Sequence, residues 1–192
     1  MEIVTSAEDF SSVSQSSDPD HALIQAVKSG DMQAYQTLYE LYGKRVYALC
    51  YRLTADRALA EDATQEVFIQ LWQKLGNFSG QSRFSTWLHS VTANVTLSYI
   101  RKQKGWVKRM FNLEDSSVAL QAEAQSCSSQ IDLDSLICRL PERARVVFVL
   151  HAIEGLRHED IGRMLNIATG SSKAQFHRAK QFLSEWMGDN HG

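Results

Sequence analysis

The sequence predicts an all-α protein with two small helical domains joined by a flexible linker. Only two prolines occur, and both stand where a helix begins, a position that tolerates the missing N–H donor. No segment alternates apolar and polar residues between turn residues, as a half-buried strand does. Apolar residues instead recur every three or four positions in two stretches, residues 18–111 and 132–188.

Composition excludes several classes of protein. The 192 residues include 20 Lys and Arg and 22 Asp and Glu, giving a formal net charge of -2. A protein that binds nucleic acid by bulk charge alone is therefore excluded, although local basic faces are not. No apolar run approaches the ~20 residues of a membrane span, and no secretory signal is visible. Three cysteines without a CxxC pair indicate a reduced, cytoplasmic protein.

Charge changes sign along the chain. Residues 1–17 are rich in serine and acids and predict a disordered tail, and the acidic stretch 112–131 predicts the linker. Residues 90–111 carry five bases and no acid, with Trp106 among them, which favours a nucleic-acid face over an ordinary solvated one. Residues 168–183 are also basic, but charge alone does not decide their role.

Four helices are expected in the first domain. The first runs from Pro19 to Ser29 and stops at Gly30, and Asp31 can cap the second. The second has an apolar stripe of Tyr35, Leu38, Tyr39, Tyr42, Val46, Leu49 and Leu53. The third buries a stripe from Ala60 to Leu75, so Asp62 and Glu66 share the opposite face with Gln65. By pattern alone this face is most simply a solvated surface. A loop over residues 76–82 leads to a fourth helix from about Arg83.

The second domain has the pattern of a helix-turn-helix. Helices are expected over residues 131–138, 141–153, 158–165 and 170–187, with a tight turn at Asn166. The last helix buries one side and presents the other outward, where it can enter a major groove. The buried side holds Ser172, Phe176, Ala179, Leu183 and Trp186, and the outer side holds Lys173, Ala174, His177, Arg178 and Gln181. We expect the buried Ser172 hydroxyl to bond the Ala168 carbonyl, in poor geometry because that carbonyl lies at the helix start. The alternatives are that the hydroxyl bridges to a DNA phosphate or caps the helix.

The sequence gives little support for an enzymatic function. The run from Gly170 to Lys173 lacks the spacing of a phosphate-binding loop. His151, Glu154 and His158 suggest metal ligands, but Gly155 interrupts the helix between them, which favours ordinary core or surface histidines. No pattern of a nucleophilic side chain with an adjacent general base can be identified in the sequence. We therefore expect no catalysis, no metal and no cofactor.

Two blocks of residues resemble the bacterial sigma-70 family. Residues 60–68, which read AEDATQEVF, together with Trp72 and the run SRFSTWL at 82–88, are similar to region 2. The run LPER at 140–143, EGL at 154–156 and HRA at 177–179 are similar to region 4. The absence of a recognisable region 3 between them resembles the extracytoplasmic-function (ECF) subgroup.

The resemblance implies a promoter-recognition subunit of RNA polymerase without catalysis of its own. By it, Asp62, Gln65 and Glu66 would dock on the coiled coil of the β′ subunit of the polymerase core, and the β subunit of the core is a further implied partner. The melted −10 strand would be held by Asn77, Phe78, Gly80, Ser82, Asn94, Arg101, Lys102 and Lys104. The −35 element would be read by Ser171, Lys173, Ala174, Gln175, His177 and Arg178. An anti-sigma factor, often membrane-bound in this subgroup, is an implied partner.

Four positions depart from the family pattern. Ala93 stands where an Arg is common, Ser98 where an Asp is common, Ser172 where an apolar residue is usual, and Gln175 where an Arg is common. The first two concern the −10 contacts and the last two the −35 preference. Two other functions stay open at this point: a stand-alone helix-turn-helix regulator that binds duplex DNA, and a sigma-like interaction module.

Overall fold

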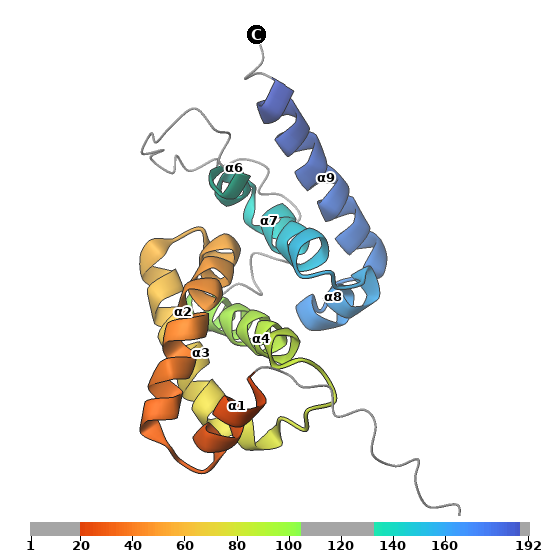
Figure 1. The fold of residues 1–192 in the computed structure, drawn as a ribbon. Helices are drawn as coiled ribbons and strands as arrows, with labels where there is room; N and C mark the ends of the chain where they lie inside the picture. Colours follow the sequence, from red (N-terminus) through yellow and green to blue (C-terminus); the bar gives the residue numbers. More distant parts are fainter. Residues whose placement is uncertain (1–19, 105–132, 189–192) are drawn as a thin grey trace, which may run out of the picture.

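The computed structural model describes residues 20–104 and 133–188, and within those ranges it contains helices and turns but no strand (Figure 1). The expected all-α fold with two helical domains is confirmed. The predicted tail, the predicted linker and Trp106 lie outside the described residues, so the domain boundaries at 17, 111 and 131 stay predictions.

Over residues 20–104, the N-terminal domain consists of four α-helices and a short 3₁₀ turn. They are α1 (His21–Lys28), α2 (Met32–Thr54), α3 (Arg57–Lys74), η1 (Leu75–Asn77) and α4 (Phe84–Lys104). Gly30 ends α1 with a φ of 92°, which a side chain would strain. The Asp31 carboxylate accepts hydrogen bonds from the backbone N–H groups of Gln33 and Ala34, so the expected cap of α2 is confirmed.

The core of this domain lies between α2, α3 and α4. The expected stripe of α2 is buried except at Tyr35, which is half-buried, and Tyr39, which is 49% exposed. Tyr39 instead lies at the edge of the core, where its ring packs on Phe68 with centroids 4.6 Å apart. The stripe of α3 is buried at Ala60, Ala63, Val67, Leu71 and Leu75.

The C-terminal domain is built from α6 (Leu133–Arg139), α7 (Glu142–Phe148), the π turn η2 (Val149–Ile153), α8 (His158–Leu165) and α9 (Thr169–Gly188). Asn166 has a φ of 56° and closes α8, as the turn prediction required. A Cβ on Gly162 would lie 2.8 Å from the Ile167 carbonyl, so this close turn needs glycine. Helix, tight turn and longer helix confirm the helix-turn-helix.

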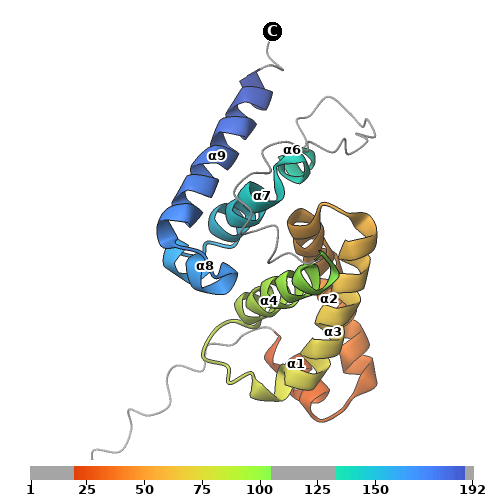
Figure 2. The same cartoon turned by 180° about the vertical axis from the view of Figure 1, so that it is seen from behind.

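The two domains lie against each other. In both views, α4 runs beside α7 and α8, while α9 forms the outer face of the C-terminal domain (Figures 1 and 2). Helix α2 also contacts α6 and α7. This packing of the domains on one another was not predicted from the sequence.

Candidate polymerase and nucleic-acid interface

The α3 face predicted to dock on a partner is exposed. Asp62 and Gln65 are exposed, and Glu66 is half-buried. The Asp62 carboxylate accepts a hydrogen bond from the Tyr99 hydroxyl at 3.0 Å, and Glu66 accepts one from the Gln70 amide at 2.7 Å. These bonds fix the two carboxylates without removing them from solvent.

Large apolar side chains continue this face toward the C-terminal end of α3. Ile69 is 54% exposed and Trp72 is 40% exposed. The Trp72 ring meets Tyr35 edge to face with centroids 4.9 Å apart, which holds it in place. The sequence analysis assigned Trp72 to a motif but did not predict that it is exposed. The face therefore combines carboxylates at one end with aromatic and aliphatic surface at the other.

The loop before α4 is anchored by Phe78. The residue is 8% exposed, and its ring packs against Phe84 and Trp87, with centroids 5.7 and 5.3 Å away. The Phe78 carbonyl accepts a hydrogen bond from Lys28 Nζ at 2.7 Å. The Phe78 ring therefore anchors the loop in the core of the domain and does not point into solvent. The other predicted loop residues, Asn77, Gly80 and Ser82, are exposed.

Helix α4 presents its predicted DNA-binding residues unequally. Asn94 and Lys102 are exposed, and the Asn94 amide donates to the Ser90 carbonyl at 2.9 Å. Arg101 is half-buried, and its guanidinium donates to the Met164 carbonyl of α8. Burial lowers the pKa of Arg101 from its ordinary value. Lys104 ends the helix, and its side chain lies outside the described part of the structure.

Helix α9 has the two sides expected of it. Ser172, Ala179 and Leu183 are buried, and Phe176 and Trp186 are partly buried. The opposite side is exposed at Ser171, Lys173, Ala174, His177 and Arg178, while Gln175 is half-buried. The first three turns of this helix therefore offer a cationic, hydrogen-bonding surface of the kind that reads base edges and phosphates.

The expected partner of the Ser172 hydroxyl was wrong. The structure pairs its Oγ with Nδ1 of His158 at 2.9 Å, while the Ala168 carbonyl accepts the backbone N–H of Ser172. The His158 ring stacks on His151 with centroids 4.0 Å apart, and His151 Nδ1 donates to the Leu156 carbonyl at 2.8 Å. Desolvation, together with the nearby His151 and Lys173, lowers the pKa of His158. These histidines thus tie the start of α9 to α8 and η2.

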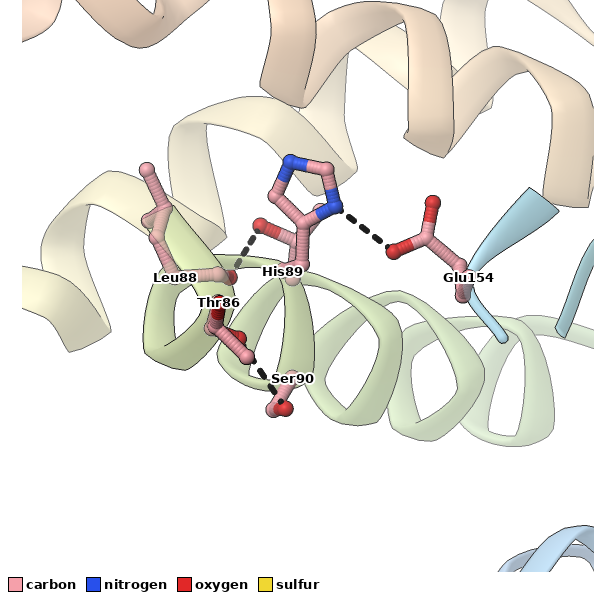
Figure 3. A network of polar contacts seen from close by, with 6 residues as sticks. Thr86, Leu88, His89, Ser90 and Glu154 are labelled. Atoms are coloured by element: carbon pink, nitrogen blue, oxygen red, sulfur yellow. Dashed lines mark hydrogen bonds and ion pairs between the residues drawn. The ribbon is translucent and has the colours of Figure 1, made fainter. Parts of the chain in front are cut away.

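Glu154 does not join the two histidines. It lies across the domain boundary from α4, where its Oε2 is 2.7 Å from Nδ1 of His89 (Figure 3). Within residues 20–104 and 133–188, no group of three or more His, Cys, Asp or Glu is placed to hold a metal ion. In the same ranges, no helix is long and apolar enough to cross a membrane.

Sequence reasoning missed the residues that join the two domains. Arg52 of α2 forms two hydrogen bonds with Asp134 of α6, at 2.8 and 3.0 Å, although the two residues are 82 positions apart. Arg145 of α7 is buried and bonds carbonyls of α2. No spacing in a single sequence reveals such distant pairs, and Arg145, which follows Glu142 and Arg143 in the sequence, looks like another surface charge.

Comparison with known proteins identifies both domains. The sigma-70 region 2 family model matches residues 38–105, and the sigma-70 region 4 model matches residues 130–183. The chain is 32% identical over 184 residues to the ECF RNA polymerase sigma factor SigW of Bacillus subtilis (strain 168), covering 86% of this chain and 95% of SigW. It is 33% identical over 164 residues to the ECF RNA polymerase sigma factor SigE of Mycolicibacterium smegmatis, covering 81% of this chain and 62% of SigE.

Two solved structures share the fold at lower identity. CnrH, in complex with the cytosolic domain of CnrY, matches with a TM-score of 0.52 at 19% identity, covering 90% of this chain and 99% of CnrH. The sigma factor RpoE of Bartonella quintana, in complex with the anti-sigma factor NepR, matches with a TM-score of 0.52 at 23% identity, covering 80% of this chain and 96% of RpoE.

Proposed function

The chain belongs to the ECF subgroup of the sigma-70 family of RNA polymerase sigma factors, and we propose how its residues divide the work of promoter recognition. The observation that carries the proposal is the presence of two exposed, chemically distinct helix faces, one in each sigma domain. Helix α3 offers carboxylates and apolar side chains, and α9 offers bases and hydrogen-bonding groups.

The α3 face binds the polymerase core. Asp62, Gln65 and Glu66 supply hydrogen-bond acceptors and charge, and Ile69 and Trp72 beside them supply apolar area. Interfaces of this kind gain most of their affinity from buried aromatic and aliphatic anchors, with charged groups fixing the register. We expect Trp72 to be the anchor because its ring is already held by Tyr35.

The loop and α4 hold the melted −10 strand. Asn77, Gly80 and Ser82 contact the strand from the loop, while Asn94, Arg101, Lys102 and Lys104 contact it from α4. A nucleobase taken out of the stack can be recognised by hydrogen bonds to its exposed edge. The Arg and Lys side chains of α4 pair with the phosphates of the strand. Phe78 contributes indirectly, because its buried ring holds the loop in position.

The exposed side of α9 reads the −35 element. Lys173 and Arg178 pair with phosphates or guanine edges, and Ser171, Gln175 and His177 offer hydrogen bonds. Ala174 allows close approach of the helix backbone. Gln175 favours adenine where the family's common Arg favours guanine, so the −35 preference is expected to differ from that of typical members.

The chain acts as a transcription initiation factor in the cytoplasm, without catalysis of its own. An anti-sigma factor is a proposed partner, because members of the ECF subgroup are commonly held inactive by one.

Run-off transcription with purified core polymerase tests the proposal. Core polymerase with this chain and a genomic fragment library should yield discrete transcripts that core polymerase alone does not. Replacement of Asp62, Gln65 and Glu66 by Ala should abolish them. Sequence-specific binding to duplex DNA by the chain alone, with no transcripts, would instead identify a stand-alone regulator. Core binding with no transcripts would identify an interaction module.

A further inference from the structure

The loop before α4 is fixed at Phe78 by contacts from three different elements. The Phe78 ring packs on Phe84 and Trp87 of α4, and its backbone N–H donates to the Leu75 carbonyl of η1 at 3.0 Å. These two contacts come from the elements that the loop joins. The third comes from α1, because the Phe78 carbonyl accepts a hydrogen bond from Lys28 Nζ at 2.7 Å, 50 positions away in the sequence. A helix that is distant along the chain therefore holds the backbone of this loop.

Lys28 contacts the ring of Phe78 as well as its backbone. The Nζ atom lies 5.7 Å from the ring centroid, within the ~6 Å range of a cation–π contact. A lysine in the last turn of a helix also offsets the helix macrodipole, but that role needs no specific partner. The paired contacts on one residue of the loop indicate a more specific role for Lys28.

Helix α1 holds the backbone of Lys28 in place. Ile24 and Val27 of α1 are 2% and 4% exposed in the core of the N-terminal domain. At the start of this helix, the Tyr42 hydroxyl donates to the Asp20 carboxylate. Helix α1 contacts α2 and η1, and both views show it beside η1 (Figures 1 and 2). Lys28 directly follows the buried Val27, so its side chain extends to the loop from a fixed point.

The position of Phe78 determines where the proposed DNA contacts of the loop lie. Asn77 directly precedes it, and Gly80 and Ser82 follow it closely. All three are exposed. A hydrogen-bonding group discriminates between nucleobases only when it is held at the right place, and a loop that is ordered before binding loses less entropy when it binds. A contact that fixes the Phe78 carbonyl therefore also supports the neighbouring residues.

We propose that Lys28 is a positioning residue for −10 recognition, because its ammonium fixes the Phe78 carbonyl and thereby the loop that recognises the bases of the melted strand. The inference rests on the proposed function in assigning this loop to the −10 strand. Without the Lys28 contact, the loop samples other conformations, and only the fraction in the binding-competent conformation selects the correct base.

Three single variants test the proposal. Lys28→Met removes the charge and the donors but keeps an unbranched side chain, whereas Lys28→Arg keeps both and should restore the function. Lys74→Met is the matched control, because Lys74 ends α3 just before η1 and its Nζ donates to Gln70 of its own helix at 2.7 Å. This control removes one positive charge near the same loop and leaves the contact on Phe78 intact. Circular dichroism and thermal unfolding report whether each variant keeps its fold.

Loop order in the full chain is the first readout, and it needs no polymerase. ¹⁵N relaxation of the backbone amides of residues 78–83 measures loop motion on the picosecond to nanosecond timescale. The heteronuclear NOE of these amides should fall in Lys28→Met. It should keep its wild-type values in Lys28→Arg and in Lys74→Met.

Base discrimination by the holoenzyme is the second readout. Core polymerase with each variant transcribes a promoter recovered by run-off transcription and versions of that promoter with single base changes in the −10 element. The ratio of transcript yields between the original and the changed promoters should fall about three- to tenfold in Lys28→Met and stay near the wild-type ratio in the other two variants. A direct contact of Lys28 with a phosphate would instead weaken transcription from all these promoters alike.

Unchanged loop order in a folded Lys28→Met variant would overturn the inference. A more mobile loop with unchanged base discrimination would also refute the role in −10 recognition, as would an equal loss of discrimination in Lys74→Met. The proposed function is judged separately. Absence of transcripts from the wild-type holoenzyme would count against that function, whereas the relaxation measurement by itself decides whether Lys28 anchors the loop.

Discussion

Replacement of Ser172 tests whether the structure has the hydroxyl's partner right. Ser172 is fully buried, and its Oγ pairs with His158 Nδ1 at 2.9 Å. Removing a hydrogen bond of this kind costs ~0.5–1.5 kcal/mol. Ser172→Ala should therefore destabilise the chain by about 1 kcal/mol and lower the unfolding temperature by about 2–4 °C.

Ser172→Val makes the test sharper because its sign depends on the partner. An ill-satisfied hydroxyl would make Val stabilising, since each added buried methyl group contributes ~0.8 kcal/mol. If the hydroxyl is satisfied and the site beside the Phe176 and His158 rings is filled, Val is destabilising for two reasons. The hydrogen bond is lost, and the extra methyl group overpacks the site, which costs ~1–3 kcal/mol. We expect a lower unfolding temperature for Val as well.

A double-mutant cycle isolates the bond itself. Ser172→Ala and His158→Ala, measured singly and together by thermal unfolding of the full chain, should show a coupling energy of ~0.5–1.5 kcal/mol. A Val variant that unfolds at a higher temperature than the wild type, or a coupling energy near zero, would show that the hydroxyl is not bound by His158.

Four further outcomes are expected. Alanine at Asp62, Gln65 and Glu66 together should weaken binding to core polymerase in a pull-down while circular dichroism stays unchanged, and unaltered affinity would remove this face from the interface. The isolated chain should bind duplex DNA with a log–log salt slope shallower than the value of about -7 expected if eight bases met phosphates; tight, sequence-specific binding would argue against this. Arg145→Met should lower the unfolding temperature, because it leaves buried carbonyls without a donor. Folding lowers the pKa of His158, so below the ordinary histidine pKa of 6.5 the unfolded chain binds more protons than the folded one, and the stability of the fold falls as the pH drops through that range. The loss of stability should be smaller in His158→Gln. An equal loss in that variant would show that His158 is not responsible.

Local signals explain what the sequence predicted well. Asp31 and Gly30 are a cap and a stop whose effect depends only on their neighbours, and both are found where expected. The turn at Asn166 and the two sides of α9 follow from the same short-range geometry. These features need no knowledge of what packs against them.

Contacts between distant residues explain what the sequence did not predict. Ser172 was correctly placed in the core, but its partner lies 14 residues away in the preceding helix, beyond the one-turn reach of a helical pattern. Phe78 reads as an exposed loop aromatic until Phe84 and Trp87 are seen to enclose it. The sequence suggests that Arg145 is a surface residue, whereas in the structure it donates to a carbonyl at the end of α2.

Permanganate reactivity of promoter thymines tests the central claim most directly, because it detects strand opening rather than binding. On a promoter recovered from the transcript library, core polymerase with this chain should make thymines of the −10 element reactive, and Asn94→Ala or Lys102→Ala should reduce that reactivity while leaving core binding intact. The chain without core polymerase should leave the duplex unreactive. Protection of the site by the chain alone, with no reactive thymines when core polymerase is added, would contradict the account.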